Sequence, residues 1–146
     1  MRASQRFPKL NFVIAGVKLK DRRFKKLNIS KRENLFLLPS ITEAEKAWLY
    51  RNACALLALS RSEGFDLPVL EAVHAKCPVL LSDIPVHHEL YKEAEWVKTE
   101  EDLWKSLYLA KNANLKVPTP RGTYTWEKAA QRSLLFFLRV LLNKDR

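Results

Sequence analysis

The sequence predicts a single α/β domain built on a parallel, doubly wound, Rossmann-like sheet. Short apolar runs alternate along the chain with helical patterns, as expected for parallel strands joined by crossover helices. Two of these runs, Cys54–Ser60 and Pro78–Asp83, enclose a glycine-containing loop and a helix, which is the order of a crossover unit. The chain has 146 residues, of which 47% are hydrophobic and 29% charged, so it can enclose one ordinary globular core.

Five strands are expected because each is a short apolar run of strand length. They are Asn11–Ala15, Leu35–Leu38, Ala55–Ser60, Val79–Ser82 and Glu95–Val97. Helical patterns occupy Lys18–Leu27, Thr42–Arg51, Leu67–Lys76, Val86–Tyr91 and Glu101–Ala110, and a last helix runs over Trp126–Asn143. Thr42 and Glu45 have the spacing of a capping box, and Thr125 is the expected cap of the last helix.

The loop Glu63–Glu71 (EGFDLPVLE) lies between the two strands of the crossover unit. In open α/β sheets, ligands bind beyond the carboxyl ends of the strands, where this loop is expected. Gly64 lets the backbone approach a ligand closely, and the start of the next helix offers unpaired N–H groups. Glu63 and Glu71 then flank a phosphate-sized pocket, and this combination suits a nucleotide sugar.

The stretch ALSRSEGFDLPVLEAVHAKCPVLLSDIPVHHEL, residues 58–90, resembles the signature of the retaining glycosyltransferases of family four. Two glutamates embedded in Glu-Gly-Phe-x-Leu-Pro-x-x-Glu-Ala form the donor-site motif of that family. Weaker similarity extends to LNFVIAG (Leu10–Gly16), LYRNACALLALS (Leu49–Ser60) and TYTWEKAA (Thr123–Ala130). The resemblance covers nearly the whole chain and implies the carboxyl-terminal, donor-binding half of a two-domain GT-B fold.

The resemblance also implies roles for individual residues. Glu63, the candidate catalytic residue, would face the hydroxyls of the donor sugar rather than act as a nucleophile, and Glu71 would accept hydrogen bonds from the ribose hydroxyls. The remaining donor-binding residues border the diphosphate, several of them through backbone N–H groups: Ser62, Gly64, Phe65, Asp66 and Leu67. The Asp66 carboxylate would repel a phosphate, so we expect it to point away and cap the helix that starts at Leu67.

The activity implied by the family is transfer of a sugar, with retention, from a nucleotide diphosphate sugar to a saccharide or lipid-linked acceptor, without metal or cofactor. Family members begin this domain with a strand followed by Gly-Arg and then a lysine, and nothing before Leu10 matches them. Residues 1–146 are therefore expected to form one nucleotide-sugar-binding domain without its first strand and without the partner amino-terminal domain. The chain alone should be inactive or weak, and Lys18 and Lys20 are poor substitutes for the missing cations.

Three explanations of the missing strand stay open: a truncated piece, direct pairing of the strands on either side, or a strand supplied by another chain. The alternative function is a non-catalytic nucleotide-sugar-binding or assembly subunit that needs a separate amino-terminal-type partner. The last helix is apolar around most of its circumference, so it should be covered by an amino-terminal domain, a second copy or a membrane surface.

Composition limits the cellular location, the metal sites and the partners expected for this chain. Cys54 and Cys77 fit no metal or disulfide pattern, so both are expected to be reduced, buried and structural, which favours a cytoplasmic protein, peripheral at a membrane at most. His74, His87 and His88 fit no zinc spacing. The net charge of +10 includes a basic cluster at Lys18–Lys26, which we interpret as a solvated face, since no nucleic-acid motif accompanies it.

Overall fold

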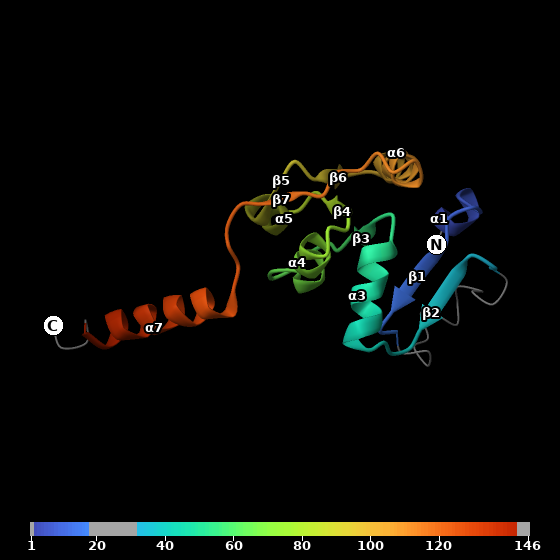
Figure 1. The fold of residues 1–146 in the computed structure, drawn as a ribbon. Helices are drawn as coiled ribbons and strands as arrows, with labels where there is room; N and C mark the ends of the chain where they lie inside the picture. The colour runs from blue at the N-terminus through green and yellow to red at the C-terminus, as the bar shows by residue number, and fades with distance from the viewer. Residues whose placement is uncertain (1, 18–31, 143–146) are drawn as a thin grey trace.

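The computed structural model describes residues 2–17 and 32–142 and shows short strands interleaved with helices (Figure 1). The elements are α1 (Arg2–Arg6), β1 (Phe12–Ala15), β2 (Leu35–Leu38), α3 (Glu43–Asn52), β3 (Leu56–Ala58), α4 (Leu67–His74), β4 (Val79–Ser82), α5 (Pro85–Leu90), β5 (Tyr91–Lys92), β6 (Glu95–Val97), α6 (Glu100–Lys111), β7 (Thr119–Pro120) and α7 (Trp126–Leu142). The five predicted strands are present, with Ala55–Ser60 shortened at both ends. The helix expected over Lys18–Leu27, and with it Lys18 and Lys20, lies outside the described residues.

The central sheet is parallel, in the order β3–β4–β6. Leu56 of β3 pairs with Val79 of β4, and Leu80 of β4 pairs with Glu95 of β6. Helix α4 connects β3 to β4, so the predicted crossover unit is confirmed. The mixed α/β class with parallel strands is confirmed as well.

The predicted continuous sheet is divided in two. Strands β1 and β2 pair with each other in parallel, with Phe12 opposite Leu35, and form a separate two-stranded sheet. Among the described residues, β1 pairs only with β2, and β3 only with β4. Direct pairing of β1 with β3, one of the three explanations left open by the sequence, is therefore wrong, and each of these strands keeps an open edge.

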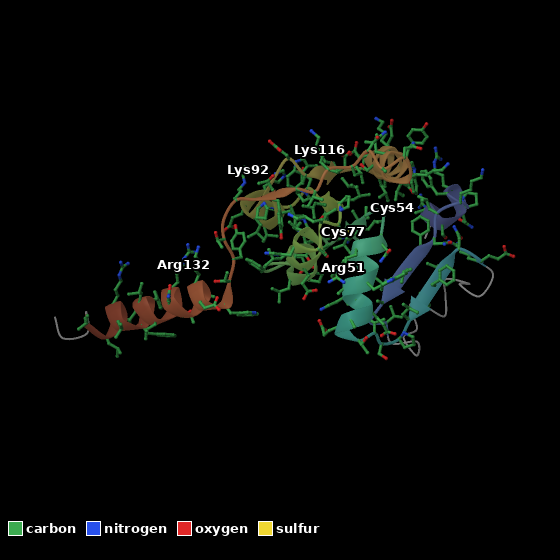
Figure 2. All side chains as sticks on the ribbon, viewed as in Figure 1. Arg51, Cys54, Cys77, Lys92, Lys116 and Arg132 are labelled. Atoms are coloured by element: carbon green, nitrogen blue, oxygen red, sulfur yellow. The ribbon has the colours of Figure 1, made fainter. Side chains whose placement is uncertain are left out.

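The core surrounds β4, whose Val79, Leu80 and Leu81 are all buried. From α4, Val69, Ala72 and Val73 pack into the same cluster because apolar residues at this spacing share one face of the helix. Cys77 joins this core, and burial raises the pKa of its thiol. Cys54 was expected to be buried in a strand, but it is exposed just before β3. Figure 2 labels both cysteines.

The ends of the helices follow local rules closely. The predicted capping box at Thr42 and Glu45 is present, and a second one joins Thr99 and Asp102 at the start of α6. Just beyond the end of α4, Lys76 adopts a left-handed conformation at φ 63°. There the N–H of Cys77 donates to the carbonyl oxygen of Ala72, a helix end that usually carries glycine.

Two features lie at the carboxyl-terminal end of the described chain. A short antiparallel pair, β5–β7, folds the segment after α6 back beside α5, and the sequence did not predict it. Helix α7 then projects away from the body of the molecule, as Figure 1 shows, and all of its described residues are exposed. No described helix has the length and apolar character required to cross a bilayer.

Candidate functional site

The loop between β3 and α4, residues 59–66, lies at the carboxyl end of β3, beside the carboxyl end of β4. Because the two strands are parallel neighbours, the turn that follows β4 reaches the same edge of the sheet. The Ser82 hydroxyl at the end of β4 donates to the carbonyl oxygen of Ser60 over 2.7 Å. This hydrogen bond joins the base of the predicted donor loop to the central strand.

Asp66 holds the other end of the loop through a residue that the sequence did not assign. Its Oδ2 lies 3.0 Å from Nε2 of the buried His87 on α5, while Nδ1 of that imidazole lies 2.9 Å from the carbonyl oxygen of Ser82. A carbonyl oxygen only accepts, so Nδ1 donates to it, and a proton must then lie between Nε2 and the carboxylate. Asp66 stands at the N-cap of α4 at φ 60° but makes no side-chain capping bond, so the predicted capping role is wrong.

The tip of the loop is open to solvent. Ser62, Glu63 and Gly64 are exposed, and a Cβ added to Gly64 would meet no atom within 4 Å. Within the described chain, the N–H groups from Gly64 to Leu67 donate no hydrogen bond, and the backbone bonds of α4 begin with Val69 donating to Asp66. The loop therefore presents free amides at the start of an eight-residue helix.

Phe65 anchors the loop from behind. Its ring is half-buried and meets Tyr124 edge to face, with the ring centroids 5.2 Å apart. Tyr124 belongs to the segment between β7 and α7, which Arg121 ties to α5 and β5 by donating to the carbonyl oxygens of His88 and Tyr91. Leu67, by contrast, is exposed rather than part of the core.

Glu71 faces helix α3. The Nζ of Lys46 lies 3.1 Å from Oε1 and 3.0 Å from Oε2 of this carboxylate, and the Tyr50 hydroxyl donates to Oε2 over 3.3 Å. A carboxylate offers about four acceptor positions, so capacity for a further hydroxyl donor is left on this half-exposed side chain.

The pKa values of Lys46 and Tyr50 are shifted by the acids beside them and by burial. Glu43, at 2.8 Å, and then Glu71 raise the pKa of Lys46, which stays positively charged. Burial, followed by the charge of Glu71, raises the pKa of Tyr50 to about 12, so its phenol stays protonated and can donate. The Glu71 carboxylate is thus held in place by two donors before any ligand arrives.

The structure joins some of the predicted residues and separates others. Gly64, Phe65, Asp66 and Leu67 form one continuous turn, whereas Glu63 and Glu71 share no partner. Among the described residues, Glu63 forms neither an ion pair nor a hydrogen bond. Sequence reasoning missed the residues that support the site from other elements: Lys46, Tyr50, His87 and Tyr124. Only the spacing of Lys46 and Tyr50, one helical turn apart, hinted that they share a face.

The other two histidines have structural partners. Nδ1 of His74 lies 2.8 Å from the carbonyl oxygen of Leu70, one turn back along α4. His88 stacks on Trp96 and contacts Asp83, and this histidine, ahead of Lys98, lowers the pKa of the Asp83 carboxyl. In the described parts of the chain, no three His, Cys, Asp or Glu side chains cluster so that they could hold a metal ion.

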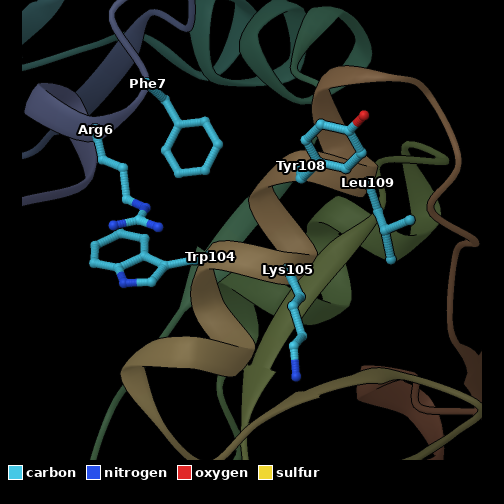
Figure 3. Close-up of a pocket in the computed structure, with 6 residues that line it drawn as sticks. All are labelled: Arg6, Phe7, Trp104, Lys105, Tyr108 and Leu109. Carbon is cyan, nitrogen blue, oxygen red and sulfur yellow. The ribbon is translucent and has the colours of Figure 1, made fainter.

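A separate hollow of about 540 Å³ lies between α1 and α6 (Figure 3). It is lined by Arg6, Phe7, Trp104, Lys105, Tyr108 and Leu109. The Arg6 guanidinium lies over the Trp104 ring at 5.4 Å, and Phe7 packs against the same ring. This contact docks α1, an element that the sequence did not predict, and it includes no residue of the predicted donor loop.

Comparison with known proteins identifies the family. The family model described as glycosyl transferases group 1 matches residues 1–112, more than half of the chain. The chain belongs to this family. The resemblance drawn from the Glu63–Glu71 motif is therefore confirmed.

Two curated relatives illustrate the similarity. The serotype-specific mannosyltransferase WbdA of Escherichia coli is 34% identical over 112 residues, 68% of this chain and 13% of the relative. The O-antigen chain mannosyltransferase RfbU of Salmonella typhimurium is 34% identical over 82 residues, 55% of this chain and 23% of the relative. The chain thus spans between about one-eighth and one-quarter of the length of these relatives.

Proposed function

We propose that this chain is the donor-binding domain of a retaining glycosyltransferase, which passes a sugar from a nucleotide diphosphate sugar to a saccharide or lipid-linked acceptor. The observation that carries this proposal is the exposed turn from Gly64 to Leu67, with free amides at the start of α4 and a preoriented carboxylate at Glu71. Family membership supports it. The names of both relatives make mannose the first sugar to test.

The roles follow from the chemistry of each group. The amides from Gly64 to Leu67 donate to the diphosphate, where a helix start favours negative charge. Glu71, held by Lys46 and Tyr50, accepts hydrogen bonds from the ribose hydroxyls, and Glu63 on the exposed tip accepts them from the sugar. Ser62 borders the same phosphate. The amides stabilise the negative charge of the diphosphate in this scheme, and we propose that no metal or cofactor takes part.

We further propose that residues 1–146 act together with an amino-terminal-type domain and with one more parallel strand. The open edges of β1 and β3 support this proposal, because an unpaired edge presents free backbone donors and acceptors to an added strand. The same edges favour the alternative function, a non-catalytic binding or assembly subunit that becomes complete only with a separate partner. Turnover after the partner is added separates an enzyme from such a subunit.

Ligand-detected NMR on the full chain tests the proposed function. The probes are guanosine, uridine and adenosine diphosphates, each free and as the mannose derivative. Glu71→Gln should weaken both forms about 10- to 100-fold, because a charge-assisted hydrogen bond contributes about 1.5–3 kcal/mol. Glu63→Gln should weaken only the sugar-bearing form.

Glu89→Gln is the matched control, since it neutralises an exposed acid on α5 and should leave every affinity unchanged. The proposal fails if no diphosphate binds at millimolar concentration. It fails equally if Glu71→Gln binds as tightly as Glu89→Gln.

A further inference from the structure

Tyr91 is fully buried, yet its hydroxyl makes no hydrogen bond within the described chain. The residue is the first of β5, directly after α5, and its side chain has no exposed surface. In residues 2–17 and 32–142, its hydroxyl is the one buried side-chain polar atom without a partner. A buried hydroxyl in this state is destabilising and rare in folded proteins. The group is therefore a donor that can gain a hydrogen bond if an acceptor approaches it.

The Tyr91 side chain is packed beneath the donor loop. It belongs to the central hydrophobic cluster, against which Phe65 of the loop and Tyr124 also pack. Burial, followed by Asp66 and then Tyr124, raises the pKa of Tyr91 to about 12. The phenol thus stays protonated, and the Asp66 carboxylate is close enough to act on it through its charge.

The Asp66 carboxylate has an oxygen that is free to accept. Its side chain is only 7% exposed, and Oδ2 lies 3.0 Å from Nε2 of His87. Within the described ranges, Oδ1 accepts no hydrogen bond. A carboxylate offers about four acceptor positions, so most of its capacity is unused. An unpaired acceptor and the unpaired Tyr91 donor therefore share the buried side of the loop.

A bound diphosphate would bring these two groups together. Under the proposed function, on which this inference rests, the diphosphate lies against the amides from Gly64 to Leu67. Asp66 belongs to the same turn, so its carboxylate and the diphosphate repel each other. Repulsion moves the carboxylate towards the interior, where His87 and Tyr91 lie. A hydroxyl that donates to a carboxylate there forms a stronger hydrogen bond than one between neutral groups.

We propose that Tyr91 is a positioning residue of the donor loop, whose hydroxyl donates to Oδ1 of Asp66 when a nucleoside diphosphate binds. His87 keeps its contact with Oδ2, so two donors then hold the carboxylate and fix the turn with its amides towards the ligand. Tyr124 is the other polar neighbour, but a phenol oxygen is a weaker acceptor than a carboxylate. Tyr91 acts through Asp66 and does not touch the diphosphate.

Tyr91→Phe tests this role because it removes the hydroxyl and keeps the ring. In the free chain the hydroxyl is unpaired, so the variant should match or exceed the urea midpoint of the wild type. Ligand-detected NMR on the full chain compares guanosine, uridine and adenosine diphosphates. The diphosphate that binds the wild type most tightly should bind the variant about tenfold more weakly, because a charge-assisted hydrogen bond of the complex is lost.

Tyr108→Phe is the matched control. Tyr108 is an exposed tyrosine on α6, so removal of its hydroxyl should change neither the urea midpoint nor the affinity.

The Cζ atom of Tyr91 reports the hydrogen bond itself. In a chain labelled with ¹³C at the tyrosine Cζ atoms, the signal missing from Tyr91→Phe belongs to Tyr91. Saturating diphosphate should shift this signal in the wild type but not in Asp66→Gly, which removes the acceptor at a φ of 60° that glycine adopts readily. In the Asp66→Gly background, Tyr91→Phe should no longer lower the affinity.

The outcomes separate this inference from the proposed function. If the wild type binds a diphosphate and Tyr91→Phe binds it equally tightly, the positioning role is wrong and the donor site stands. If Tyr91→Phe lowers the urea midpoint of the free chain and leaves the affinity unchanged, the hydroxyl is purely structural and the inference is again wrong. If the wild type binds no diphosphate at millimolar concentration, both the inference and the proposed function are overturned.

Discussion

Asp66 is the residue that fixes the shape of the donor loop. It adopts a left-handed backbone conformation at φ 60°, which aspartate tolerates better than most residues. Its carboxylate is directed to the buried imidazole of His87 rather than to the exposed turn. The carboxylate of Asp66, which would repel a diphosphate, is therefore paired with the imidazole of His87 on the side of the loop away from the exposed turn.

We expect Asp66→Asn to retain most of the stability and Asp66→Ala to lose about 3 kcal/mol. The asparagine amide can donate to Nε2 of His87 without the shared proton, and asparagine also tolerates the left-handed region. Alanine leaves the imidazole without this partner and is itself strained at φ 60°. Urea unfolding measures the difference, and equal losses would show that charge rather than the hydrogen bond holds the pair.

At the scale of elements, the helix starts are set by the residues within one turn. Two helices start with a capping box, formed by Thr42 with Glu45 and by Thr99 with Asp102. In each, the threonine side chain accepts a hydrogen bond from the backbone N–H of the acid, and the acid side chain accepts one from the backbone N–H of the threonine. Hydrogen bonds from Thr42 lower the pKa of Glu45, and those from Thr99 lower the pKa of Asp102. Both carboxylates therefore bind protons less readily in the folded chain than in the unfolded chain.

Acid should weaken the protein through these two groups. Their stabilising effect is complete above the ordinary values of 4.5 and 3.8, and it is lost as the pH falls through the lower folded values. In the double variant Glu45→Gln with Asp102→Asn, the side-chain amides still accept the capping hydrogen bonds but do not take up protons. The urea midpoint of this variant should therefore fall less than that of the wild type between about pH 5 and pH 2. Glu33→Gln, at an exposed position, should follow the wild type; parallel curves for all three proteins would contradict this account.

At the scale of the whole molecule, the divided sheet governs which parts open first. Strand β4 has neighbours on both sides and buried side chains, whereas β1 and β3 each have one edge without a partner strand among residues 2–17 and 32–142. The N–H groups of Phe12 and Gly16 donate towards β2, and that of Leu56 donates towards β4. Because alternate residues of a strand point to opposite edges, the amides of Val13, Ala15 and Leu57 face the open edges.

Hydrogen exchange of the isolated chain should therefore show fast amides at Val13, Ala15 and Leu57. Phe12, Gly16 and Leu56 are the internal controls on the same strands and should exchange more slowly. When an amino-terminal-type domain that supplies a strand is added, the fast amides should become protected and the controls should change little. If these three amides still exchange quickly in a complex that has glycosyltransferase activity, no strand is added at these edges.

The sequence was informative where the cause of a structure lies nearby in the chain. The capping box at Thr42 and the apolar character of helix α7 follow from residues within one element, and the crossover from β3 through α4 to β4 follows from three consecutive elements. Predictions failed where a distant partner decided the outcome. Asp66, expected to cap α4, turns instead to His87, 21 residues away.

By itself, the sequence determined the α/β class, the family and the position of the Glu63–Glu71 loop, because these depend on local periodicity and on a continuous motif. Tertiary structure alone decided that Glu71 is held by Lys46 and Tyr50, that two loops are joined through Ser60 and Ser82, and that β1 stays apart from β3. Those outcomes depend on which side chains and strand edges meet across the fold, and such contacts have no fixed spacing along a chain.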